Sequence, residues 1–282
     1  MKHFMIFMTL VYSQLLWARS FENIKIPGAK CGNGADYEVF VSKLNDEKLI
    51  VEFMGGGACW ARLSCFELPR TWIRPIPNIN VFSTPTASGE NNPYIEHSML
   101  YFPYCTGDVH IGNHVAVYDG KTVYHNGRNN INLALKYLAE KKIIEFKNFK
   151  DVTVWGASAG AIAALIYAKK INGYLAAGTK KTLIADSPGM HFGEHFWDKF
   201  PQETKKDFDE AFRSVNLNVN FNDGFVARKF RPVFEIYKEW NFGILLATRD
   251  TIMSAIFGEI SPSEQEKLIP IYLNKWLKIG RS

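Results

Sequence analysis

The sequence predicts an α/β fold in which helices flank a mostly parallel central sheet and a helical cap is inserted. Three observations support this class. Short apolar segments typical of buried strands alternate with segments of helical periodicity, and the segment 151–165 passes from a β-branched run through a glycine turn into an alanine-rich helix. No repeat, linker or low-complexity tract divides residues 21–282, so we expect a single domain there.

Six strands are expected, each a short run rich in apolar and β-branched residues and bounded by polar or glycine-containing segments. The runs are Tyr37–Val41, Lys48–Met54, Met99–Phe102, Asp151–Trp155, Thr182–Ala185 and Phe242–Thr248. Helical segments at 130–138 and 161–170 flank the fourth run. The strand–helix alternation predicts right-handed crossovers between parallel strands.

A last helix is expected to close the domain. Ser261, Pro262 and Glu264 supply an N-cap, a proline at the first helical position and a carboxylate at the third. Apolar residues follow at helical spacing as far as Trp276.

The strand at 151–155 enters the pattern Gly156-Ala-Ser-Ala-Gly160, with Ser158 at its centre. This pattern between a strand and a helix is typical of a nucleophile elbow, which holds a serine hydroxyl exposed above the sheet. Ser158 is therefore the predicted nucleophile. The alternative is an ordinary glycine-rich loop, and the strand–turn–helix context favours the catalytic interpretation.

A run of three glycines, residues 55–57, follows the strand at 48–54. In serine hydrolases of the α/β class, an upstream glycine-rich loop and the residue after the nucleophile donate backbone N–H groups to the oxyanion of the intermediate. We expect Gly56, Gly57 and Ala159 to be these donors. An ordinary tight turn is the alternative.

Four ordered segments carry a resemblance to a known family: Phe53–Trp60, Pro103–His110, Tyr124–Gly127 and Trp155–Ala161. Together they resemble the pectin acetylesterases and the related Notum carboxylesterases, over roughly residues 31–250 with a weaker stretch at about 195–231. The resemblance implies an α/β-hydrolase fold that cleaves carboxylic esters, often acetyl groups on polysaccharide, with a serine triad. It maps the same nucleophile and oxyanion residues and implies an acid after a late strand.

The acid should emerge where a strand ends. Asp250 follows the apolar run 242–248, and the chain order of serine then aspartate matches this fold. Asp186 follows the strand after the elbow and is the competitor. A turn-capping aspartate is the alternative interpretation of either residue.

The sequence has no histidine at the position expected for the general base. In this fold the catalytic histidine follows the acid, and no histidine follows His195. Either a catalytic loop has been lost by C-terminal truncation or another histidine serves. The other histidines outside the N-terminal segment are His97, His110, His114, His125, His191 and His195. His110 and His125 lie in family-like motifs, where we interpret them as pocket or structural residues.

Residues 1–20 are typical of a signal peptide: a basic start, an apolar run over 4–17, and Ala18 and Ser20 at the small-residue positions of a cleavage site. We expect cleavage after Ser20 and a secreted or periplasmic protein. The alternative is a membrane anchor, but the run is shorter than the roughly 20 residues that span a bilayer.

Four cysteines in an exported chain allow two disulfides. The family resemblance implies that Cys59 pairs with Cys65, which leaves Cys31 with Cys105, while free buried thiols remain the alternative. No zinc-type spacing accompanies them in the sequence, so neither a metal nor a cofactor is expected.

The formal net charge of +5 includes the basic residues of the signal segment. The mature chain is only mildly basic, which does not favour a nucleic-acid partner. The prediction is a secreted serine carboxylesterase that acts on an acylated polysaccharide, without stable membrane insertion after signal cleavage. The cap at 190–232 would set specificity. The alternative is a catalytically silent hydrolase-like chain that binds a partner or is a truncated product.

Overall fold

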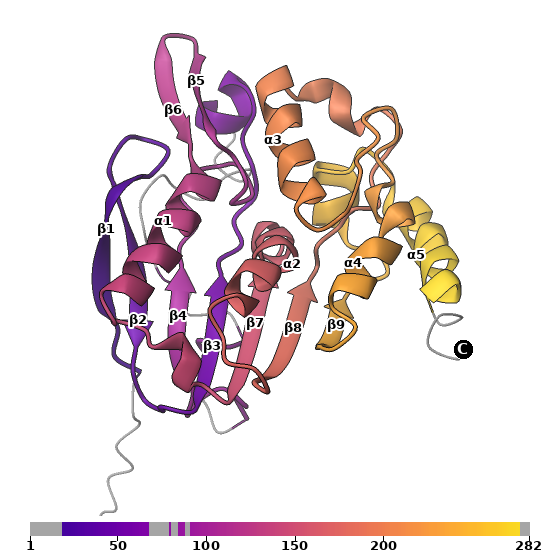
Figure 1. Ribbon diagram of the computed structural model, residues 1–282. Coiled ribbons are helices and arrows are strands. Elements are labelled where there is room, and N and C mark those ends of the chain that lie inside the picture. Colours follow the sequence, from indigo (N-terminus) through magenta and orange to yellow (C-terminus); the bar gives the residue numbers. More distant parts are fainter. Residues whose placement is uncertain (1–18, 68–78, 80–83, 88–90, 277–282) are drawn as a thin grey trace, which may run out of the picture.

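A computed structural model describes residues 19–67, 79, 84–87 and 91–276 of the chain. Seven strands form one sheet in the order β1-β2-β4-β3-β7-β8-β9 (Figure 1), and β5 and β6 form a separate hairpin. The strands are β1 Glu22–Lys30, β2 Asp36–Ser42, β3 Lys48–Phe53, β4 Ser98–Phe102, β5 His114–Tyr118, β6 Lys121–His125, β7 Asp151–Ala157, β8 Lys180–Asp186 and β9 Asn241–Leu245.

Helices alternate with these strands along the chain. The α-helices are α1 Gly127–Glu140, α2 Ala159–Asn172, α3 Gln202–Arg213, α4 Arg231–Ile236 and α5 Pro262–Trp276. The short 3-10 and π turns are η1 Leu63–Glu67, η2 Phe146–Asn148, η3 Phe196–Lys199, η4 Val226–Lys229 and η5 Ile252–Ile256.

The strands β4, β3, β7, β8 and β9 are mutually parallel, so their carboxyl ends meet at one edge of the sheet. Strand β2 runs antiparallel to both of its neighbours, β1 and β4, at the opposite side of the sheet. Val51 of β3 faces Val154 of β7 in register, and both are fully buried. The central strands are near-continuous apolar runs because both faces of a parallel sheet are covered.

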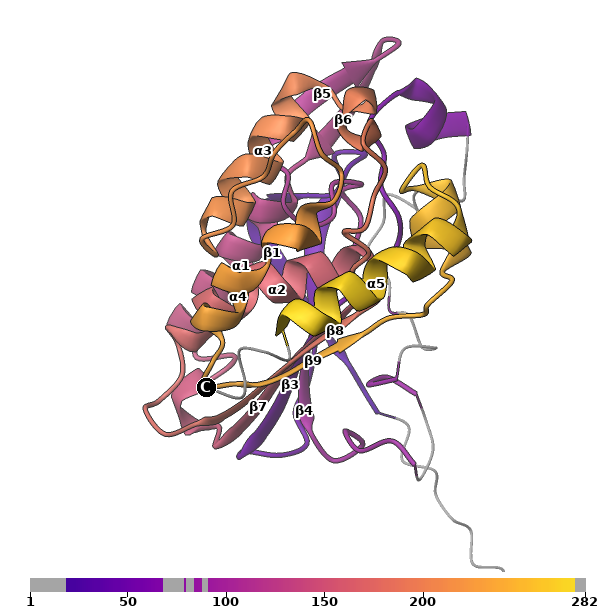
Figure 2. The ribbon, with the colours of Figure 1, turned by 90° about the vertical axis from the view of Figure 1, so that its right-hand side faces the viewer.

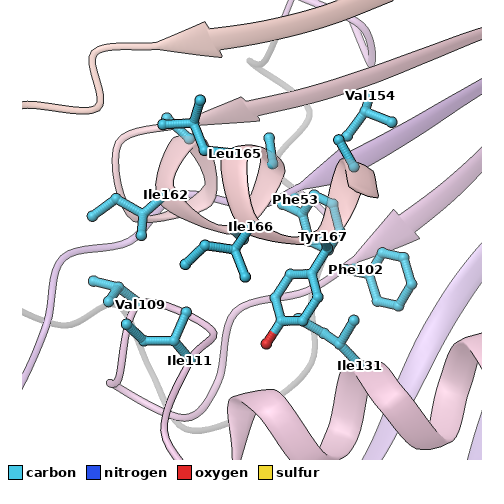
Figure 3. Close-up of a cluster of buried hydrophobic side chains, with 14 of the residues drawn as sticks. Phe53, Phe102, Val109, Ile111, Ile131, Val154, Ile162, Leu165, Ile166 and Tyr167 are labelled. Atoms are coloured by element: carbon cyan, nitrogen blue, oxygen red, sulfur yellow. The ribbon is translucent and has the colours of Figure 1, made fainter. Parts of the chain in front are cut away.

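Helices α1 and α2 lie on the same face of the sheet (Figures 1 and 2). Figure 3 shows the core between them and the strands, where the rings of Phe53, Phe102 and Tyr167 gather. The Phe53 ring stacks on Phe102 at 4.8 Å and on Tyr167 at 5.6 Å between ring centres. Helix α2 is buried around most of its circumference, so it is a core helix with no wide polar face.

The segment between β8 and β9 forms the cap. It contains η3, α3, η4 and α4, and α3 lies above the carboxyl ends of the strands beside the β5–β6 hairpin (Figures 1 and 2). The expected helical cap at 190–232 is confirmed. The α/β-hydrolase class is likewise confirmed, because a mostly parallel sheet is flanked by helices.

All six expected strands are present within a few residues. The closing helix begins as predicted: the Glu264 carboxylate accepts from the Ser261 N–H at 2.7 Å, and the Glu264 N–H donates to Ser261 Oγ at 3.2 Å. Three strands were not predicted. In β1, Pro27 and Gly28 interrupt the alternation. The β5–β6 hairpin could have been predicted, because the dipeptide Asp119-Gly120 between its strands is typical of a hairpin turn.

Both disulfides match the expectation: Cys59 pairs with Cys65, as the resemblance implied, and the remaining Cys31 pairs with Cys105. The predicted signal segment lies almost wholly outside the described residues, which begin at Arg19. Among the described helices, none has the length and hydropathy needed to cross a bilayer.

Candidate active site

Ser158 lies in the sharp turn between β7 and α2, with backbone angles φ 53° and ψ −119°. A non-glycine residue at positive φ is strained unless its surroundings hold it. Here the Ser158 N–H donates to the carbonyl of Asp186 at 2.8 Å, and the Ser158 carbonyl accepts from the Ala161 N–H at 2.9 Å. The sequence motif therefore has the turn geometry of a nucleophile elbow.

The two glycines of the motif are required by close backbone approach. A Cβ on Gly156 would stand 1.9 Å from the carbonyl oxygen of Gly160, and a Cβ on Gly160 would stand 2.0 Å from the carbonyl oxygen of Phe53. Both distances are far below van der Waals contact. Only glycine at 156 and 160 lets strand, turn and helix pack this closely.

The triple-glycine corner lies directly against the elbow. A Cβ on Gly55 would meet the Ala157 carbonyl oxygen at 2.6 Å and the Cβ of Ser158 at 3.4 Å. Gly57 adopts φ 80°, which a side chain would disfavour. The structure thus brings the residues predicted as nucleophile and oxyanion donors into one neighbourhood.

Ser158, Gly57 and Ala159 share the wall of a cavity of about 60 Å³ at the carboxyl edge of the sheet. The other wall residues are mostly apolar and come from the loop after β4, from α2, from the cap and from η5. Its aliphatic and aromatic side chains are Val109, Ile111, Ile162, Phe192, Phe196, Phe200, Phe208, Met253 and Phe257.

The cavity wall next to the glycine corner is braced covalently. Cys59, bonded to Cys65, belongs to the wall, and its N–H donates to the Gly107 carbonyl at 2.8 Å. Ser64 Oγ accepts from the N–H of Trp60 at 2.9 Å. These contacts fix the loop that carries the proposed oxyanion donors.

One group of side chains near the cavity has its potential metal ligands close together. Among the described residues, Cys59, Cys65 and His125 are the grouped side chains whose ligand atoms lie within 4.8 Å of one another. Both sulfurs are engaged in the disulfide, and a metal ligand must be a thiolate. The group therefore does not fit a metal ion in this oxidised state.

Asp108 is a half-buried turn residue in the cavity wall. Its carboxylate accepts from the Thr106 hydroxyl at 2.6 Å and from the N–H groups of Gly127 at 2.7 Å and His110 at 3.1 Å. Burial raises the pKa of the Asp108 carboxyl above its ordinary value, although the three donors oppose that effect. Two donors belong to the turn around Asp108 and the third, Gly127, begins α1, so Asp108 ties the cavity wall to that helix.

His110 and His125 are buried and hydrogen-bonded through their rings. His110 Nε2 lies 2.7 Å from the Met54 carbonyl oxygen, and burial lowers the pKa of His110 to about 4. His125 bonds to the Thr106 carbonyl through Nδ1 at 2.9 Å and to the Tyr118 hydroxyl through Nε2 at 3.1 Å. These partners support the structural interpretation of both histidines.

The Ser158 hydroxyl has one hydrogen-bond partner among the described residues, the Met253 sulfur at 3.9 Å. No histidine nitrogen lies within hydrogen-bond reach of it in that part of the chain. His97 is half-buried, His191 is buried, and the side chain of His195 is 80% exposed. None of these three is among the residues that line the cavity.

The two candidate acids lie outside the cavity wall. The Asp250 carboxylate accepts from the N–H groups of Ile252 and Met253, both at 3.0 Å, and so caps the turn η5. Asp186 accepts from the Ser187 hydroxyl at 3.0 Å. Asp250 therefore fixes the segment that places Met253 against Ser158.

Two groups of residues in the cavity wall were not predicted from the sequence. One is the pair His114 and Asp207, which joins the β5–β6 hairpin to the cap. The other is the segment around Met253 and Phe257, which Lys199 ties to the cap through the Phe257 carbonyl at 2.5 Å. The chemistry-bearing residues were visible in the sequence, but their proximity depends on contacts across 58 to 95 positions.

The comparisons with known proteins agree with this geometry. The family model described as Pectinacetylesterase matches residues 19–229. No curated protein matches the chain. Two crystal forms of the Wnt deacylase Notum from Drosophila are similar in structure, with TM-scores of 0.57 and 0.55 at 12% and 13% identity; each match covers 91% of this chain and 82% of Notum.

The structural likeness shows a shared fold, and the family match covers most of the described residues, including the glycine corner and the elbow. Together they indicate a carboxylesterase-type hydrolase. The chain belongs to the pectinacetylesterase family.

Proposed function

We propose that this chain is a secreted serine carboxylic-ester hydrolase that removes acyl groups, acetyl above all, from an acylated polysaccharide. The observation that carries the proposal is that Ser158, in a strained turn, shares a cavity wall with Gly57 and Ala159. Two disulfides and a family that acts on esters support an extracellular hydrolase.

In the proposed reaction, the Ser158 hydroxyl oxygen attacks the ester carbonyl carbon while its proton passes to a base. The N–H groups of Gly56, Gly57 and Ala159 stabilise the oxyanion, an effect worth on the order of 3 kcal/mol per donor. The tetrahedral intermediate collapses and the alcohol leaves with a proton. Water then hydrolyses the acyl-enzyme. Asp250 is the proposed acid, which would orient the base.

The volume of the cavity favours a short acyl group in the substrate. It measures about 60 Å³, whereas roughly 10–15 Å³ of the same measure accommodates one water molecule. An acetyl group or a chain of a few carbons fits that space, and a sugar polymer does not. The polymer alcohol would therefore remain outside while the acyl group enters among the Phe side chains.

A second candidate is the catalytically silent hydrolase-like chain. The observation that favours it is the Ser158 hydroxyl, which contacts the Met253 thioether rather than a histidine. A serine acts as a nucleophile only when a base removes its proton, which requires an approach to about 2.6–3.2 Å. The silent chain would keep the fold and the cavity without turnover.

The test is labelling of the purified protein with a fluorophosphonate probe, together with hydrolysis of p-nitrophenyl acetate. An active serine esterase labels and turns over, and Ser158→Ala abolishes both. Ser263→Ala, at an exposed serine at the start of α5, is the matched control and retains both. Absence of labelling in the unaltered protein would favour the silent chain, and labelling that survives Ser158→Ala would reject Ser158 as nucleophile.

A further inference from the structure

Two histidine rings lie side by side in the cavity wall, His114 and His125, with 4.9 Å between ring centres. Their bonding differs. Both nitrogens of His125 have partners, whereas only Nδ1 of His114 does, and His114 Nε2 is buried without a partner among the described residues. A buried polar atom of this kind destabilises the fold unless a hydrogen-bond partner satisfies it.

The His114 ring is fixed by Asp207 of α3. The Asp207 Oδ2 atom lies 2.6 Å from His114 Nδ1 and accepts the Asn113 N–H at 2.7 Å, while Oδ1 accepts from Arg128 of α1 at 3.1 Å. Arg128 also pairs with Glu210 at 2.8 Å. Three elements thus hold one carboxylate, which in turn holds the imidazole.

This arrangement determines the tautomer of His114. An ionised carboxylate only accepts hydrogen bonds, so the proton of the neutral ring lies on Nδ1, toward Asp207. The Nε2 atom is then a lone-pair acceptor. Its complementary partner is a hydroxyl group, which donates one hydrogen bond.

The rest of the wall offers little competition for a polar ligand atom. Apart from His114, His125, Thr204, Asp108 and Asp207, the cavity beyond Ser158 is lined by backbone and by apolar side chains. The Asp108 and Asp207 carboxylates are engaged by the donors already described. His114 lines this cavity, and its Nε2 is an acceptor that no described donor engages.

We propose that His114 is a specificity-determining residue that accepts a hydrogen bond from a hydroxyl on the acyl group, so that the preferred substrates are esters of short hydroxyacyl chains. The inference rests on the proposed function, because it places the acyl group in the Ser158 cavity. The cavity volume limits the chain to a few carbons. His114 is not assigned as the base, since the Ser158 hydroxyl is hydrogen-bonded to Met253 and not to the His114 ring.

The test compares 3-hydroxybutyryl with butyryl esters, which differ by one hydroxyl. Binding of the two methyl esters is measured by calorimetry on Ser158→Ala, so that the result does not depend on turnover. Hydrolysis of the two p-nitrophenyl esters is measured on the unaltered serine. One additional hydrogen bond predicts a preference of about three- to tenfold for the hydroxyacyl ester in both measurements.

The diagnostic variant is His114→Asn, whose amide N–H can replace Nδ1 toward Asp207 but which lacks the Nε2 acceptor. The hydroxyacyl preference should fall to about one. His195→Asn is the matched control, because His195 Nδ1 also pairs with an aspartate, Asp198 at 3.1 Å, but on the exposed surface. It should retain the full preference.

Three outcomes would overturn the inference: equal binding of both esters to the Ser158→Ala protein, a preference that survives His114→Asn, or equal loss of kcat for both esters with a changed pH profile. The last would assign His114 to proton transfer. A binding preference that His114→Asn removes supports the inference even if the unaltered protein hydrolyses neither ester, and that result would reject only the proposed function.

Discussion

The carbonyl oxygen of Phe53, at the end of β3, lies 2.0 Å from the point where a Cβ on Gly160 would stand. This contact joins the strand that leads into the glycine corner to the first turn of α2. It links the two halves of the proposed oxyanion site, because β3 precedes Gly55–Gly57 and α2 follows Ser158.

Gly160→Ala should therefore be severely destabilising. A methyl group cannot be accommodated against a backbone carbonyl without displacing strand or helix, and we expect a loss of about 3 kcal/mol or more, or failure to fold. Gly243→Ala in β9 is the control, since a Cβ there meets nothing within 4 Å. Urea unfolding measures both, and a loss below about 1 kcal/mol for Gly160→Ala would contradict the packing.

Backbone strain at Ser158 predicts a second stability effect. A residue held at φ 53° and ψ −119° costs on the order of 1–3 kcal/mol, and glycine avoids most of that cost. Ser158→Gly should be more stable than Ser158→Ala by about 1 kcal/mol, although both lack the hydroxyl. Thermal unfolding of the two variants checks this, and equal midpoints would indicate a relaxed turn.

Asp250→Asn separates the catalytic role proposed for Asp250 from its capping role. Asparagine keeps an oxygen acceptor for the Ile252 and Met253 N–H groups, so the free energy of unfolding should change by less than about 1 kcal/mol. If Asp250 orients the base, kcat on p-nitrophenyl acetate should fall by about 10⁴-fold. Asp186→Asn is the comparison variant, and a larger loss there would transfer the role to Asp186.

The two disulfides should contribute unequally to stability. Cys31 and Cys105 are separated by 74 positions and Cys59 and Cys65 by 6. A disulfide stabilises a fold by restricting the unfolded chain, and it does so more for a longer loop. Loss of the bond should therefore lower the free energy of unfolding by roughly 4 kcal/mol for the long loop and by roughly 2 kcal/mol for the short one. The test replaces both cysteines of one disulfide by serine and compares the two double variants by urea unfolding. A greater loss of stability for the short loop would contradict the prediction.

Acid should weaken the fold through the buried histidines. Burial lowers the pKa of His110 and of His125 from 6.5 to about 4. Between pH 6.5 and 4 the unfolded chain takes up protons that the folded chain does not, so stability is full above pH 6.5 and falls as pH decreases through this window. Each histidine contributes on the order of 3 kcal/mol to the fall.

His125→Asn should flatten this pH dependence, because asparagine can donate to the Thr106 carbonyl without titrating. The measurement is the free energy of unfolding at pH 7 and at pH 4.5 for the variant and for His195→Asn, at an exposed histidine. An unchanged slope in His125→Asn would show that this ring is protonated in the folded state.

Much of the scaffold follows from local patterns in the sequence. The central strands, the elbow around Ser158 and the capped start of α5 depend on β-branched runs, glycine spacing and a capping box within a few residues. Strand β1 was missed because local propensity is weak there and pairing with β2 stabilises it.

The sequence by itself determined the fold class, the sharp turn at Ser158 and the glycine corner, because each depends on the conformations that neighbouring residues allow. Only the tertiary structure decided what surrounds the Ser158 hydroxyl. Met253 reaches it from 95 positions away, and the pair of His114 and Asp207 enters the same cavity from β5 and α3. These contacts arise from the packing of distant elements, whose side chains carry no local signal of the partner they meet.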